Sequence, residues 1–207
     1  MPSYKLTYFD VRGLGDPIRQ QFHLAGVKFE DKRVTHEEFT KIKSKTGFGQ
    51  LPVLTVDGFD IPQSAAIGRY LAKKFGYAGK TPEEEAWVDA IVDQFKDFGT
   101  AFKTLFIAKR ENKSVDEIEK INKEIFTPAK DSYFKILTGL LEKSKSGFLV
   151  GAELTWADLV VVENLVTLEK LGHLSAKDHP KLVALKKKVH ETPKLKEYFA
   201  NRKDTDI

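Results

Sequence analysis

The residues from Gly47 to Ala66 combine a turn, a proline and a helix start in an arrangement that suits ligand binding. Ser64 precedes a helical pattern, and we expect it to be the N-cap of that helix. The first N–H groups of a helix have no acceptor within the helix and lie at the positive end of its dipole. Residues Gln63 to Ala66 therefore form a candidate site for a carboxylate.

The residues before this helix predict a β-hairpin with an accessible edge. Val53 to Val56 and Phe59 to Ile61 are β-rich runs, and Asp57-Gly58 between them accepts the positive φ values of a two-residue turn. Pro52 stands where the first strand starts, so its missing N–H costs least. Because an X-Pro bond has a cis penalty of only ~0.5 to 1 kcal/mol, both isomers of Leu51-Pro52 stay open. An ordinary hairpin and helix without a ligand would use the same residues.

The elements that must position this stretch predict an α/β domain over residues 1–78. Tyr4 to Phe9 reads as a strand, Asp16-Pro17 opens a helix with the acid as its cap, and Val27 to Val34 reads as a second, charged edge strand. Thr35 and Glu38 have capping-box spacing for a short helix. The resulting order, β-α-β-α-β-β-α, is typical of a thioredoxin-like domain with a parallel first pair of strands.

From Thr81-Pro82 onward the pattern is helical, so we expect an all-helical second domain over residues 82–207. A long apolar stripe runs from Val88 to Phe106, and Pro128 should kink or split a later helix. Thr155 and Asp158 have the spacing of another capping box. That box opens a helix that is apolar on most sides and is therefore expected to be central in the domain.

The composition excludes several classes of protein. The 207 residues include 34 basic and 30 acidic ones, mostly interspersed, so the net charge of +4 does not indicate a nucleic-acid partner. The absence of cysteine excludes disulfides, and sulfur chemistry would have to come from a ligand. The five histidines are scattered, which predicts no metal site. The first twenty residues have no signal-peptide pattern and no run is long enough to span a membrane, so we expect a cytoplasmic protein without a membrane partner.

Five motifs in order resemble the cytosolic glutathione transferases, and among these the sigma-like class of many invertebrate enzymes and the glutathione-dependent prostaglandin D synthases. The motifs are Tyr4-Lys5-Leu6-Thr7-Tyr8-Phe9 with Arg12-Gly13, Gly49-Gln50-Leu51-Pro52-Val53-Leu54, Gln63-Ser64-Ala65-Ala66-Ile67, Val88-Asp89-Ala90-Ile91-Val92-Asp93 and Gly147-Phe148-Leu149-Val150-Gly151. The resemblance covers the full length, and it implies glutathione as co-substrate.

The resemblance implies that Tyr8 is the catalytic residue, whose hydroxyl donates a hydrogen bond to the glutathione sulfur. The thiolate is the nucleophile, and a thiol with a pKa of about 8.5 is mostly protonated at neutral pH. A charge-assisted hydrogen bond of ~1.5 to 3 kcal/mol would lower that pKa by roughly one to two units. Without the other motifs, Tyr8 would read as an ordinary aromatic residue of a strand.

The resemblance also implies a set of binding residues. Those for glutathione are Tyr8, Phe39, Lys43, Gly49, Gln50, Leu51, Pro52, Gln63, Ser64 and Asp97. Among them, Gln50 to Pro52 would pair with the cysteinyl backbone, and Gln63 and Ser64 would hold the γ-glutamyl end. Asp97 matches an acid that reaches the glutathione of a neighbouring subunit, which implies a homodimer. For Lys43 and Asp97, a solvated helix charge is the competing interpretation. Candidates for the apolar substrate are Phe9, Val11, Leu14 and Phe102.

Two residues depart from the sigma-like pattern. Phe39 stands where many members have tryptophan, so a donor to the glycine carboxylate is lost. Leu14 stands where the prostaglandin synthases have an arginine close to the thiol, so prostaglandin isomerisation is not carried over. The expected function is conjugation of glutathione to small apolar electrophiles in detoxification. The alternatives are a carrier of apolar ligands such as haem, a glutathione-dependent peroxidase using the same site, and a prostaglandin isomerase using the same site, which Leu14 disfavours.

Overall fold

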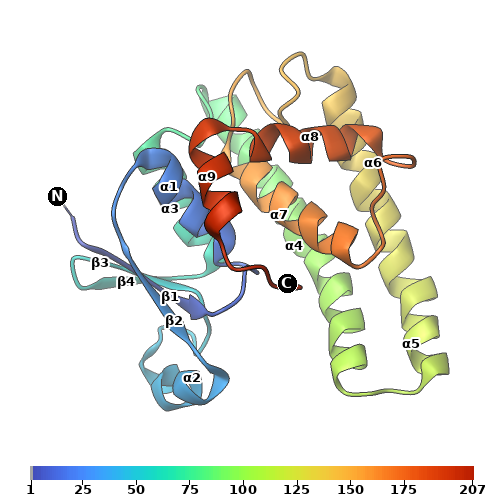
Figure 1. Cartoon of the computed structure of the whole chain (residues 1–207), viewed down its shortest axis with the longest axis horizontal. Coiled ribbons are helices and arrows are strands. Elements are labelled where there is room, and N and C mark those ends of the chain that lie inside the picture. Colours follow the sequence, from blue (N-terminus) through green and yellow to red (C-terminus); the bar gives the residue numbers. More distant parts are fainter. Residues whose placement is uncertain (1) are drawn as a thin grey trace.

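The computed structural model describes residues 2–207, which fold into an α/β part followed by a helical part (Figure 1). Four strands form one mixed sheet in the order β2-β1-β3-β4. They are β1 (Tyr4–Phe9), β2 (Glu30–Val34), β3 (Val53–Val56) and β4 (Phe59–Pro62). As predicted, β1 and β2 are parallel and β2 lies at the edge, whereas β1–β3 and β3–β4 are antiparallel. This sheet has the thioredoxin-like arrangement.

Three helices flank the sheet. The helices α1 (Asp16–Ala25) and α3 (Ser64–Phe75) pack together on one side, and α2 (His36–Ile42), followed by the short 3-10 turn η1 (Lys43–Lys45), lies on the other (Figure 1). The predicted capping box of α2 is confirmed, because Thr35 and Glu38 exchange their side-chain and backbone hydrogen bonds. The two-residue turn at Asp57-Gly58 is also confirmed, with φ values of 48° and 88°.

Two predicted helix caps are wrong, and both are wrong in the same way. Asp16 and Ser64 are the first residues inside α1 and α3, so their backbones are already helical and their side chains cap nothing. Gly15 and Gln63 are the actual N-caps. Instead of capping, the Asp16 carboxylate is buried in a network of charges, as described below. The second strand is also shorter than predicted and begins at Glu30.

The second part contains a helical bundle. Its elements are α4 (Pro82–Arg110), α5 (Val115–Ile121), the π-helical segment η2 (Asn122–Phe126), α6 (Thr127–Lys143), α7 (Trp156–Lys170), α8 (Pro180–His190) and α9 (Pro193–Asn201). Pro128 lies in the first turn of α6, directly after the π-helical segment, so the predicted helix is split there. The boundary predicted between residues 78 and 82 falls between α3 and α4 and stays a prediction. Within residues 2–207, no helix has the length and apolar character needed to cross a bilayer.

Helix α7 is the centre of the second part, as its apolar sequence predicts, and it also contacts the first part. Trp156 at its start is buried against α3, where a Cβ on Gly68 would lie only 2.6 Å from the indole ring. Glycine is therefore required at this close approach. The backbone N–H of Trp156 also donates to the Tyr77 carbonyl at 3.0 Å. These contacts fix α7 beside α1 and α3.

Candidate active site

A cavity of about 610 Å³ lies between the two parts of the chain. Its walls come from the loop after β1, from α1 and the start of α3, and from α4 and α7, and most of its lining is apolar. A volume of this size suits a small organic molecule. Of the residues implied by sequence resemblance, Tyr8, Leu14, Gln63 and Ser64 line this cavity.

Tyr8, the last residue but one of β1, has a buried ring, and its hydroxyl lies at the cavity. The backbone N–H of Leu14 donates to the Tyr8 hydroxyl oxygen at 3.1 Å, which leaves the hydroxyl proton free to be donated elsewhere. Burial raises the pKa of Tyr8, although the Leu14 hydrogen bond and the charge of Arg19 act in the opposite direction. The side chain is therefore a neutral phenol and a hydrogen-bond donor at neutral pH.

Arg19, which the sequence analysis did not single out, holds the loop that carries Leu14. This guanidinium is buried, and it donates to the carbonyl of Val11 at 2.9 Å and to the carboxylate of Asp31 at 3.0 and 3.1 Å. It also lies 5.9 Å from the centroid of the Tyr8 ring. Arg19 thus connects α1 to β2 and to the loop beside the phenol.

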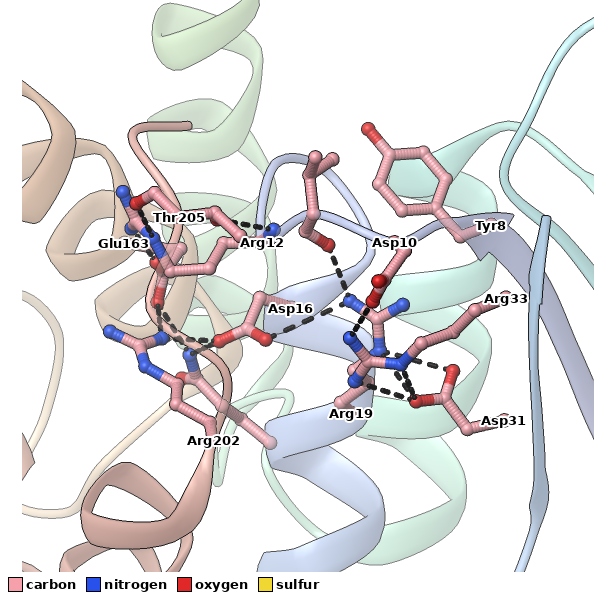
Figure 2. A network of polar contacts seen from close by, with 12 residues as sticks. Tyr8, Asp10, Arg12, Asp16, Arg19, Asp31, Arg33, Glu163, Arg202 and Thr205 are labelled. Atoms are coloured by element: carbon pink, nitrogen blue, oxygen red, sulfur yellow. Dashed lines mark hydrogen bonds and ion pairs between the residues drawn. The ribbon is translucent and has the colours of Figure 1, made fainter. Parts of the chain in front are cut away.

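A second buried group of charges joins the loop to the last residues of the chain (Figure 2). Arg12 pairs with Glu163 of α7 and donates to the backbone carbonyls of Thr205 and Asp206, both at 3.0 Å. Asp16 and Glu163 share one cation, because Arg202 contacts both carboxylates. The amide of Gln20 also donates to both of them, at 2.9 and 2.8 Å. Glu163 and Ile207 border the cavity, so this network forms part of its wall.

The two carboxylates of this network respond differently to burial. For Asp16, burial acts to raise the pKa, but Arg202, the Tyr198 hydroxyl, Gln20 and Arg19 together hold it below its usual value. For Glu163, burial and the nearby Asp16 charge raise the pKa despite Arg202 and Arg12. Glu163 is thus the carboxylate that depends most on keeping its cations.

The start of α3 provides the other polar wall of the cavity. Gln63 has a φ of 74°, which a residue with a side chain rarely adopts and which costs of order 1–3 kcal/mol. This geometry is typical of functional sites. The Gln63 side-chain amide donates to Gln50 at 3.3 Å, so two of the residues implied by the resemblance lie together. The Leu51–Pro52 peptide bond between them in sequence is cis.

Four further predicted residues lie around α2 and the following turn, outside the cavity lining. Gly49 packs against the aliphatic part of Lys43, with 3.6 Å between the position of a Cβ on the glycine and the Lys43 Cε. The rings of Phe9 and Phe39 are in edge contact, with centroids 5.4 Å apart. Successive residues of a strand point to opposite faces, so Phe9 cannot face the cavity that Tyr8 faces. Val11 lies in the loop and accepts from Arg19.

On α4, the cavity and the predicted residues use different faces. The stripe that borders the cavity recurs at three- and four-residue steps and consists of Val92, Phe95, Lys96, Gly99, Thr100 and Lys103. Phe102 lies on the core-facing side of the helix, where its ring contacts those of Phe98 and Phe126. Asp97 is exposed and is not among the cavity residues. The periodicity of α4 predicts a buried stripe but does not distinguish a packed face from one that borders a cavity.

Comparisons with known proteins agree with this geometry. Residues 4–73 match the family model "Glutathione S-transferase, N-terminal domain", and residues 96–202 match "Glutathione S-transferase, C-terminal domain". The chain is 49% identical to glutathione S-transferase 4 of Caenorhabditis elegans over 207 residues, which cover all of both chains.

Solved structures agree in fold as well. A glutathione S-transferase of Caenorhabditis elegans has 57% identity and a TM-score of 0.91, covering 99% of this chain and 100% of that one. A Nu-class glutathione S-transferase of Haemonchus contortus has 45% identity and a TM-score of 0.88, with complete coverage of both chains. The chain belongs to the glutathione S-transferase family, whose enzymes use glutathione as co-substrate. The sigma-like subclass is not confirmed, since Nu-class relatives are found among the matches.

Proposed function

We propose that the chain conjugates reduced glutathione to small apolar electrophiles and that Tyr8 activates the thiol. The observation that carries this proposal is the Tyr8 hydroxyl at the edge of the cavity, accepting from Leu14 with its own proton free. Donated to a sulfur, this proton stabilises the thiolate by ~1.5 to 3 kcal/mol, the usual range for a hydrogen bond to a charged group. The electrophile would occupy the apolar part of the cavity, and the conjugation would serve detoxification.

In this proposal the glutathione lies along the edge of the first domain. The N–H groups at the start of α3, with Gln63 and Ser64, hold the α-carboxylate of the γ-glutamyl residue. The backbone beside Leu51 and Pro52 pairs with the cysteinyl residue. Lys43 holds the glycine carboxylate, with Phe39 beside it and Gly49 allowing the lysine to pack closely.

The test is an assay of conjugation to an aromatic halide from pH 6 to 9, comparing the wild type with Tyr8→Phe. The variant should lose 10-fold or more of its kcat/KM at neutral pH and recover as pH rises, because more glutathione then ionises without help. Tyr70→Phe, on the far part of α3, is the matched control and should keep wild-type activity. Glutathione binding without turnover in the wild type would instead support the carrier alternative, and reduction of an organic hydroperoxide would support the peroxidase one.

We further propose a homodimer in which Asp97 reaches the glutathione of the neighbouring subunit. Asp97 is exposed on α4 and outside the cavity of its own chain, as such a role requires. Sedimentation of the wild type should give twice the mass of one chain, and Asp97→Asn should raise the KM for glutathione with the dimer intact. A monomer with full activity would contradict both parts. The subclass and the cytosolic location expected from the sequence stay predictions.

A further inference from the structure

The charged side chains that line the cavity do not balance one another. Among residues 2–207, the acidic and basic ones in the lining are Lys96, Lys103 and Glu163. Glu163 is buried and paired with both Arg12 and Arg202, so its charge is already compensated within the wall. Both lysines are exposed on α4. The side chains of the lining therefore carry an excess of positive charge.

The two lysines differ in their contacts. Lys96 donates to the carboxylate of Asp93, three residues earlier on the same helix, at 2.8 Å. Lys103 takes part in no ion pair of the described chain. Ile207 also borders the cavity, but its backbone oxygen accepts from the N–H of Arg12 at 3.1 Å. Within residues 2–207, Lys103 is thus the cation of the lining that has no counter-ion.

The stripe of α4 that borders the cavity changes from apolar to polar along the helix. Val92 is buried and Phe95 is half-buried, whereas Thr100 and Lys103 are exposed. Val92 and Lys103 are ~16 Å apart along the helix axis, at 1.5 Å per residue. The Thr100 hydroxyl donates to a backbone carbonyl of its own helix. One wall of the cavity is therefore apolar at one end and open, with a free cation, at the other.

This arrangement suits a ligand that is apolar along its length and anionic at one end. An apolar chain can be buried against Val92 and Phe95, while a carboxylate at its end stays at the exposed end of the stripe. There the carboxylate keeps water, so its charge does not have to be buried. A lysine carries its charge on a long flexible stem that packs along apolar surface, so it can follow such a group. A neutral electrophile would gain nothing from Lys103.

We propose that Lys103 binds a carboxylate at one end of an elongated apolar electrophile, and that the preferred substrates are unsaturated carbonyl compounds with such an acid group. The proposal rests on the proposed conjugation and specifies its substrate class. In the reaction the glutathione sulfur forms a bond to the β-carbon, and the electron pair of the double bond moves toward the carbonyl. Water then supplies a proton to the α-carbon, and no group leaves. An exposed lysine is commonly a solvated charge, so the experiments must distinguish these two roles.

The first experiment uses straight-chain α,β-unsaturated ketones in pairs of equal length, one ending in a carboxylate and one in the primary amide. The amide has nearly the same shape without the charge. At the chain length that reacts fastest, wild-type kcat/KM at low salt should favour the carboxylate about fivefold, the upper range for an exposed ion pair. Added salt should reduce this preference, because exposed charges are screened. Equal kcat/KM for the two ketones at low salt would overturn the proposal.

Charge reversal assigns the preference to one residue. Lys103→Met should make the two ketones equal, and Lys103→Glu should favour the amide. Lys109→Glu makes the same chemical change on α4 outside the cavity and should leave the wild-type preference intact. Because Lys103 is exposed and has no ion pair to lose, both of its variants should keep the wild-type midpoint of thermal unfolding. A preference for the carboxylate that survives Lys103→Glu, or that is inverted by Lys96→Glu alone, would contradict the assignment.

A binding experiment separates recognition of the carboxylate from catalysis. The two corresponding saturated ketones cannot react with glutathione, and calorimetric titration gives the affinity of each. The wild type should bind the carboxylate about fivefold more tightly than the amide, and Lys103→Glu should invert this order. If no electrophile is conjugated but the inversion is observed, the proposed function fails and the role of Lys103 stands. If conjugation proceeds but neither rates nor affinities differ, the role of Lys103 fails alone.

Discussion

A Cβ atom on Gly15 would lie 2.4 Å from Cδ1 and 2.9 Å from Cγ of Tyr8, closer than side chains ever approach. Gly15 has an ordinary φ of −82°, so glycine is required here by contact with the tyrosine and not by backbone conformation. Gly15→Ala should displace the phenol or the loop and lower kcat/KM for conjugation tenfold or more, since small misplacements at a reacting centre are costly.

The control for this prediction is Gly139→Ala. Gly139 lies within α6 with no atom within 4 Å of an added Cβ, so the change should leave activity unchanged and add up to ~1 kcal/mol of helix stability. Steady-state measurements of kcat/KM for both variants test this prediction. Full activity in Gly15→Ala would show that the position of Tyr8 is not set by this contact.

The buried Arg12–Glu163 pair should be costly to break from one side. Arg12→Met leaves the Glu163 carboxylate with Arg202 alone and should lower the free energy of unfolding by about 3 to 5 kcal/mol, as for other buried pairs. Adding Glu163→Met should restore part of that loss, because no unpaired charge then remains. Lys41→Met, at an exposed pair with Glu37, should cost less than about 1 kcal/mol. Urea unfolding of the four proteins measures these differences, and a double variant that is no more stable than Arg12→Met would count against a coupled pair.

Two capping boxes with the same spacing should differ in strength. Asp158 is fully buried and accepts from the backbone N–H groups of Leu149 and Thr155, both at 2.8 Å. Glu117, which forms the capping box of α5 with Ser114, is exposed. Asp158→Ala should destabilise the fold by at least ~3 kcal/mol, since buried donors lose their acceptor. Glu117→Ala should cost much less, because water can replace the carboxylate at an exposed helix start. Thermal unfolding of the two variants measures their loss of stability, and equal losses would contradict the proposed effect of burial.

His190 should make stability depend on pH. Burial and the nearby cations lower its pKa from 6.5 to about 4, and its ring stacks on Phe199 with centroids 4.0 Å apart. Between these pH values the unfolded chain binds the proton more readily than the folded one, so this residue destabilises the fold as pH falls from about 6.5 to 4. His190→Phe should remove that part of the slope. Unfolding midpoints at pH 5 and 7.5 for both proteins measure it, and identical slopes would argue against the shift.

The sequence predicts the fold well because its signals are local. The hairpin follows from Asp57-Gly58, the α2 cap from Thr35 and Glu38, and the central α7 from its apolar composition. Each of these elements is determined by residues that lie only a few positions apart in the sequence.

The site is less predictable because its polar residues take their roles from distant partners. Asp16 reads as a helix cap but is buried with Arg202, which is 186 residues away. No local pattern in the sequence marks Gln21 for burial, yet it is buried and lines the cavity. One local signal does exist, since Glu163 is a lone acid in the middle of an apolar helix, and such a residue indicates a buried ion pair.

The position of Arg202 has a consequence for the order in which the chain folds during synthesis. Asp16 and Glu163 leave the ribosome well before the cation that they share, and domains generally fold from the N-terminus as they emerge. Until Arg202 is synthesised, Glu163 has Arg12 as its ion-pair partner, and Asp16 lacks its contact with Arg202. We infer that the first domain can form its sheet early, whereas the wall between the two domains closes last.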